Sequence, residues 1–152
     1  MGYRAPRNMF DEVIYNTKTT AELREAMSRK LVALGESVTR RGERMVTLRE
    51  TYQIDAERLA ELILRFKDEG ARATSYDNQG NPDAPIVPAG VIANIVRERE
   101  MIDGERDQIR KMELILRNIK DTEPYINEQT GEYGERPCIH VLSDDELEYL
   151  GF

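Results

Sequence analysis

Apolar side chains repeat at alternating intervals of four and three residues through the first third of the chain. The repeat places one apolar seam along a helix that packs against other helices. Arg41 occupies its one interrupted position, and its apolar members are Met27, Leu31, Leu34, Val38, Met45, Leu48 and Tyr52. The pattern predicts a helix from about Thr20 to about Tyr52, with Thr19 or Thr20 as its N-cap and Glu22 in its first turn.

A second seam with the same spacing predicts another long helix, from about Ala89 to about Lys120. Glu98 and Glu105 stand at its two missing core positions, and its apolar members are Val91, Ile95, Ile102, Ile109, Met112, Leu116 and Ile119. We expect Arg41 to pair with one of these carboxylates, within the chain or in another copy, because polar seam residues fix helix register. The alternative is that Glu98 and Glu105 face water.

The segment between the two seams predicts a short helix followed by a linker. The pattern breaks at residues 52–54, and Asp55 is a good N-cap for a helix from Ala56 to about Glu69, ended by Gly70. A helix that continues unbroken through Asp55 is the alternative, because the apolar residues that follow keep nearly the same phase. Residues 70–88 are rich in turn formers and predict a linker.

Neither end of the chain shows helical periodicity. Residues 1–18 predict an arm that either docks on an apolar surface or stays mobile. After Pro124 we expect a small hairpin or an irregular loop, then a short strand from Cys138 to Leu142. Ser143 can cap a last acidic turn that docks on another protein or folds back on its own bundle. The apolar residues of that turn are Leu147, Tyr149, Leu150 and Phe152.

These elements predict an elongated all-α protein: a coiled-coil-like antiparallel helical hairpin with a short intervening helix and irregular termini. We expect an N-terminal arm (1–18), a helical hairpin (19–121) with its linker (70–88), and an acidic C-terminal segment (122–152). Two long helices alone bury little apolar surface. We therefore expect the protein to associate with itself, as a homo-oligomer, or with another protein.

Two glycines, Gly35 and Gly42, lie one heptad apart on a stripe of small residues beside the first seam. A glycine inside a helix costs about 1 kcal/mol relative to alanine. We expect another backbone to approach this side closely, and the alternative is two tolerated surface glycines.

Composition and charge indicate elongated helices with a large solvent-exposed surface. Apolar residues make up 39% of the chain and charged residues 34%, which suits helices with one buried stripe. The net charge of −7 is concentrated after residue 120, where nine acidic residues oppose Arg136 alone. Such a tail either meets a basic surface or serves solubility. The single cysteine suggests a reducing compartment, the cytoplasm or a virion, and the absence of a long apolar run predicts no membrane partner.

Candidate chemistry is sparse. Cys138 and His140 are the only residues of their kinds and would share one side of a strand, but no further base accompanies them. Two such ligands are too few for a zinc site. We therefore expect no enzyme activity, no metal and no cofactor.

Nucleic-acid binding is the alternative function. Arg40, Arg41 and Arg44 form a basic section, and the break before Asp55 resembles the start of a helix-turn-helix whose reading helix offers Arg58. That helix also carries many acidic residues, whereas phosphate contact needs excess positive charge. The outline also fits a viral DNA-packaging adaptor, by analogy of fold alone.

The sequence thus favours a structural or adaptor protein in a larger assembly, acting through its helix seam and its terminal arms. The predicted interaction residues are Leu31, Leu34, Gly35, Val38, Arg41, Gly42, Met45, Leu48, Glu98, Glu105, Leu147, Tyr149, Leu150 and Phe152.

Overall fold

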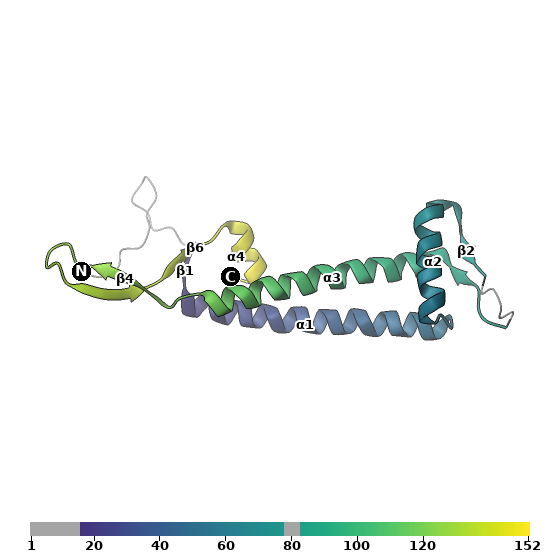
Figure 1. Cartoon of the computed structure of the whole chain (residues 1–152), viewed down its shortest axis with the longest axis horizontal. Helices are drawn as coiled ribbons and strands as arrows, with labels where there is room; N and C mark the ends of the chain where they lie inside the picture. The colour runs from purple at the N-terminus through teal and green to yellow at the C-terminus, as the bar shows by residue number, and fades with distance from the viewer. Residues whose placement is uncertain (1–15, 78–82) are drawn as a thin grey trace. The chain divides into compact units, whose positions relative to one another are not determined.

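A computed structural model describes residues 16–77 and 83–152, and this part of the chain is mostly helical (Figure 1). The α-helices are α1 (Thr20–Thr51), α2 (Ala56–Glu69), α3 (Ala89–Asn118) and α4 (Asp144–Leu150), with a 3-10 helix η1 (Gly70–Arg72). Short strands pair antiparallel in twos: β1 (Thr17–Thr19) with β6 (Ile139–Val141), β2 (Ser75–Tyr76) with β3 (Val87–Pro88), and β4 (Thr122–Ile126) with β5 (Tyr133–Pro137). The predicted helices are confirmed, as are the hairpin after residue 121 and the short strand within residues 138–142, whereas the all-α prediction missed β1, β2 and β3.

Contacts divide the chain into two compact units. The first contains Met1–Ala33 and Arg110–Phe152, and the second contains Leu34–Ile109. Residues 1–15 of the predicted N-terminal arm lie outside the described residues, and the last residues of that arm belong to β1.

Helix α1 begins with a reciprocal cap at Thr19. The Thr19 hydroxyl accepts from the Glu22 amide at 3.2 Å, and the Glu22 carboxylate accepts from the Thr19 amide at 3.1 Å. This arrangement satisfies two amides that the first helical turn leaves without partners. The prediction of an N-cap at Thr19 or Thr20, with Glu22 in the first turn, is confirmed.

The chain turns between α1 and α2, so the alternative of one unbroken helix is wrong. Gln53 has a φ of 53°, and the Ile54 amide donates back to the Arg49 carbonyl at 2.8 Å. The Asp55 carboxylate accepts from the Arg58 amide at 2.7 Å and caps α2, as predicted. Gly70 ends α2 with a φ of 56°, a conformation that glycine adopts readily.

The core of the second unit forms where α2 runs across the end of α1 and the start of α3 (Figure 1). It contains Ile54, Leu59, Leu62, Tyr76, Val87, Ile92 and Ile95, all buried. Tyr76 and Val87 come from the segment predicted as a linker. They face each other in the β2–β3 pair, so the described residues at both ends of this segment help to close the core.

The first unit is held by α1, α3 and the C-terminal segment. Its buried apolar residues are Leu23, Ala26, Met27, Met112 and Leu142. The β1–β6 pair matches Thr17 with Val141 and Thr19 with Ile139, and the Leu142 amide continues it by donating to Asn16 at 2.9 Å. The predicted cap at Ser143 is confirmed, because Ser143 and Glu146 form a capping box at the start of α4.

No helix among residues 16–77 and 83–152 is long and apolar enough to cross a membrane.

Candidate protein-interaction site

The polar residues of the two seams meet in the second unit. Arg41 Nη1 lies 3.0 Å from Glu98 Oε2, and Arg41 Nε lies 2.7 Å from Glu105 Oε1. The pairing expected of Arg41 is therefore confirmed within one chain. The alternative, that both carboxylates face water, is wrong, because the side chains of Glu98 and Glu105 are only 14% and 10% exposed.

Neighbouring side chains complete this cluster. The Ser37 hydroxyl donates to Glu105 Oε1 at 2.9 Å, and Arg44 lies 3.6 Å from Glu98. The hydrogen bonds that Arg41 donates to Glu98 and then to Glu105 raise the pKa of its guanidinium above its ordinary value. The cluster joins two helices through directional, charged contacts, which a purely apolar seam lacks. It fixes which residues of α1 and α3 stand opposite each other in this unit.

The apolar seam positions of α1 differ in burial. Leu34 is buried, Met45 and Leu48 pack against the core of the second unit, and Leu31 and Val38 are half-buried. These positions therefore belong largely to packing within the chain.

The two helical glycines contact nothing across the seam. A Cβ built at Gly35 or Gly42 meets no atom within 4 Å, so no backbone of the described chain approaches there. The expected close approach is absent within this part of the chain, and the approach of a partner at these positions stays a prediction.

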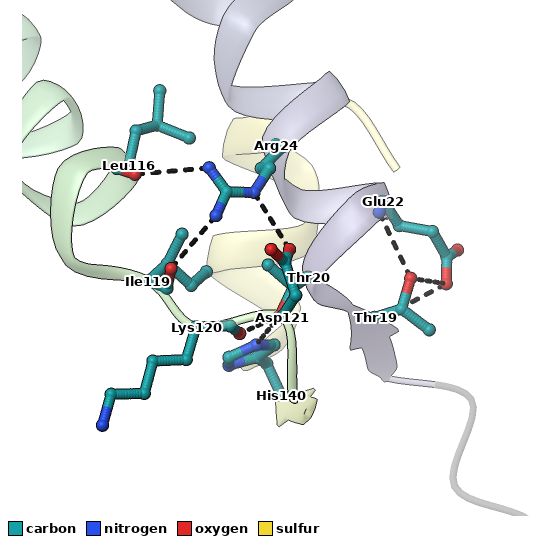
Figure 2. Close-up of polar contacts among 9 residues, drawn as sticks. All are labelled: Thr19, Thr20, Glu22, Arg24, Leu116, Ile119, Lys120, Asp121 and His140. Atoms are coloured by element: carbon teal, nitrogen blue, oxygen red, sulfur yellow. Dashed lines mark hydrogen bonds and ion pairs between the residues drawn. The ribbon is translucent and has the colours of Figure 1, made fainter. Parts of the chain in front are cut away.

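A polar network that the sequence pattern did not indicate joins α1 to the end of α3 in the first unit (Figure 2). The Arg24 guanidinium donates to the carbonyls of Leu116 and Ile119 at 3.4 and 3.1 Å, and to Asp121 at 3.3 Å. The last carbonyls of a helix lack partners within the helix and carry partial negative charge. Arg24 thus caps α3 from another helix.

Thr20 adds a second link to the same helix end. Its hydroxyl donates to the Lys120 carbonyl at 2.7 Å and lies 2.9 Å from His140 Nε2 (Figure 2). A hydroxyl has a single proton, and Thr20 donates it to the Lys120 carbonyl. The Thr20 oxygen therefore accepts a hydrogen bond from His140 Nε2–H. His140 therefore has a structural role that joins β6 to α1. Cys138, two residues before His140 in the sequence, is a half-buried free thiol.

The acidic C-terminus docks on its own chain. Lys30 lies over the Tyr149 ring at 4.3 Å from its centroid, and Lys18 lies over the Phe152 ring at 4.5 Å. Cations are attracted to the faces of aromatic rings. Leu147 and Leu150 are half-buried, and burial raises the pKa of the Tyr149 phenol. These contacts place Tyr149 of α4, and Phe152 just after α4, against basic residues of the first unit.

The four arginines proposed for nucleic acid do not form one free cationic surface. Arg41 is held by two carboxylates. Arg58 is 9% exposed, donates to the Asp77 carbonyl and pairs with Glu61 at 3.0 Å. Arg40 is exposed, and Arg44 remains 60% exposed beside Glu98. Two of the four charges are therefore already neutralised by acidic partners.

The β4–β5 hairpin has one face that is satisfied by its own side chains. Residues opposite each other in an antiparallel pair share a face, so Glu123, Arg136, Tyr125 and Gly134 lie on the same side. Glu123 and Arg136 are 2.6 Å apart, and the Arg136 guanidinium lies 5.8 Å from the Tyr125 ring centroid. We call this side the paired face.

The residues on the other side of the hairpin are exposed. It consists of Thr122, Pro124, Ile126, Tyr133, Glu135 and Pro137, each of them exposed, and we call it the open face. Tyr133 is 83% exposed and stands directly opposite Ile126, which is 50% exposed. The open face thus presents the exposed apolar side chains of Pro124, Ile126 and Tyr133. Glu135 lies among them and accepts a hydrogen bond from the Thr122 hydroxyl at 3.0 Å, and Glu132 precedes Tyr133. Sequence reasoning identified the hairpin only as one option and did not separate its two faces.

No group of three or more potential metal-ligating side chains gathers in the described ranges. The chain matches no protein-family model, no curated protein and no solved structure.

Proposed function

We propose that this protein is a non-enzymatic structural or adaptor protein that acts through helix–helix interaction and its terminal segments in a larger assembly. The long helices would form an antiparallel, coiled-coil-like hairpin. The order of contacts in each unit supports this arrangement: Arg24, early in α1, contacts the end of α3, whereas Arg41, later in α1, contacts Glu98, earlier in α3.

The open face of the β4–β5 hairpin is the observation that carries the proposal. A two-stranded hairpin is at best marginally stable alone in water. Here the paired face is held by an ion pair, whereas the open face is exposed at all of its positions. Single exposed apolar residues are ordinary on protein surfaces, but a contiguous apolar patch rimmed by polar residues marks an interaction surface.

The alternative function, a helix-turn-helix-like nucleic-acid-binding or packaging protein, has weaker support. It relies on Arg40, Arg41, Arg44 and Arg58, of which Arg41 and Arg58 are engaged with acidic or carbonyl partners. Binding to phosphates through those two residues would first require breaking their existing contacts.

The mass of the full-length protein in solution tests the proposal. The chain has a mass of 17.5 kDa, and an assembly subunit is expected to show a multiple of it by light scattering, in low and high salt alike. A mass of one chain at every accessible protein concentration would overturn the proposal that the protein associates with itself.

A further inference from the structure

Two exposed surfaces of the first unit have complementary composition. The first is the open face of the hairpin. The second lies on the last turns of α3, and we call it the helix patch: Arg110, Lys111, Leu114, Ile115 and Arg117, all exposed. Leu114 is 56% exposed and Ile115 is 46% exposed, whereas Met112, in the same part of α3, is buried.

The two surfaces carry opposite charge. Residues 122–137 contain four acidic side chains and one basic side chain, a net charge of −3. Residues 110–118 contain three basic side chains and one acidic side chain, a net charge of +2. On the helix, the basic residues stand three or four positions from Leu114, so they share its side. Both surfaces therefore combine an apolar centre with a charged margin, and the margins attract each other.

The same charges argue against contact between two identical faces. Two open faces placed together would bring Glu132 and Glu135 of both copies into one interface, where like charges repel. Two helix patches would concentrate basic residues in the same way. A contact between unlike surfaces avoids both penalties.

We infer that the open face of one copy docks on the helix patch of a second copy, in a head-to-tail contact. Ile126 and Tyr133 would cover Leu114 and Ile115, with Glu132 and Glu135 beside the basic margin. Among the described residues both surfaces are exposed, and only residues 119–121 separate α3 from β4, so the contact we infer is one between two copies. A head-to-tail contact builds a ring if it closes and a filament if it does not. This inference rests on the proposed assembly function and specifies its contact.

Mixing two variants of the full-length protein tests the head-to-tail geometry. Ile126→Ser with Tyr133→Ser removes the open face, and Leu114→Ser with Ile115→Ser removes the helix patch. We expect wild type to form oligomers, each variant alone to be monomeric, and an equal mixture to form dimers, because one intact contact remains between the two variants. Leu64→Ser is the matched control, since Leu64 is 70% exposed on α2, and it should keep the wild-type mass.

The outcomes separate this inference from the proposed function. Wild type that associates while both variants keep its mass overturns the contact and leaves the assembly function standing. Monomeric variants whose mixture stays monomeric overturn the head-to-tail geometry. Monomeric wild type overturns the self-association of the protein, and the inference falls with it.

A photo-crosslink provides a test that does not depend on how the serine variants fold. Tyr133→p-benzoylphenylalanine keeps an aromatic ring at the open face. Irradiation should give a band of two chains in a denaturing gel, and mass spectrometry should map the attachment to the α3 peptide that contains Leu114 and Ile115. Attachment to another segment, or the absence of a two-chain band, would contradict the inference.

Discussion

Arg41 Nε lies 2.7 Å from Glu105 Oε1, and this ion pair links two positions that interrupt otherwise apolar helix seams. Each residue alone is a charged side chain at a position where its helix seam is otherwise apolar. Together, and with Glu98 at 3.0 Å, they form a specific contact that an apolar pair would not provide. One register of α1 against α3 in the second unit satisfies these charges, whereas a shifted register would leave them without partners.

Breaking this pair should destabilise the fold. Glu105 is 8% exposed, and losing its charged hydrogen bonds in Glu105→Leu should lower the free energy of unfolding by about 1.5–3 kcal/mol. Arg41→Leu should also destabilise, because it leaves two carboxylates without their shared cation. The double variant should lose less than the sum of the single variants.

Urea denaturation of the three variants measures this coupling, with Arg44→Leu as the control. Arg44 is 60% exposed and lies 3.6 Å from Glu98, so its loss should change stability by no more than about 0.5 kcal/mol. Strictly additive effects of Arg41→Leu and Glu105→Leu would show that the pair is not coupled.

Removing the Thr20 hydroxyl should be costly for its size. Thr20 is 2% exposed, and Thr20→Val leaves the Lys120 carbonyl without its donor and His140 without its acceptor. Loss of a buried partner typically costs about 1–3 kcal/mol. Thr47→Val is the matched control on the exposed side of α1 and should change stability little. Thermal unfolding followed by circular dichroism compares them, and equal melting temperatures would contradict the role assigned to Thr20.

The cap of α1 should make stability depend on pH in acid. The pKa of Glu22 is lowered from its ordinary value of 4.5, first by the hydrogen bond from the Thr19 amide. A carboxyl whose pKa falls on folding stabilises the native state above its unfolded pKa, and this contribution disappears as pH falls through the folded pKa. The melting temperature of wild type should therefore exceed that of Glu22→Gln at neutral pH, and the difference should shrink below pH 4.5.

Glu25→Gln is the control for that comparison, because Glu25 is an exposed carboxylate one turn further along α1. A Glu22→Gln effect that persists unchanged into strong acid would show that the ionised cap is not its cause.

Binding to DNA should be weak. The charges of Arg41 and Arg58 are engaged, which leaves Arg40 and Arg44 as the exposed members of the proposed set. Few phosphate contacts give a shallow dependence of affinity on salt. Fluorescence anisotropy with a labelled duplex should show no saturable binding near physiological salt. Tight binding that is lost in Arg40→Glu with Arg44→Glu would instead favour the nucleic-acid alternative.

Long periodic patterns made the helices predictable from sequence. The seams located α1 and α3, and the capping residues Asp55 and Ser143 identified the starts of α2 and α4. Even the partner of Arg41 followed from the pattern, because opposite charges occupied equivalent positions in two seams. These signals are local or strictly repeated, so one sequence is enough to reveal them.

The contacts that periodicity missed are those between distant, irregular segments. Nothing near Tyr76 or Val87 indicates that they pair and close a core, because two-residue strands are too short to show alternation. Likewise, Arg24 reads as an ordinary charged residue on a helix surface. Its role depends on the carbonyls of Leu116 and Ile119, which lie far away in sequence.

The β1–β6 pair has a further consequence, for the order in which the chain folds. It brings Thr17 beside Val141, and the nearby Thr20–His140 hydrogen bond joins residues 120 positions apart. Bringing such distant residues together costs loop-closure entropy, which the shorter loops between neighbouring elements largely avoid. Contacts of this kind form late because the intervening chain has to be organised first. The first strand is therefore expected to wait, during synthesis, for a partner strand that the ribosome makes long after it.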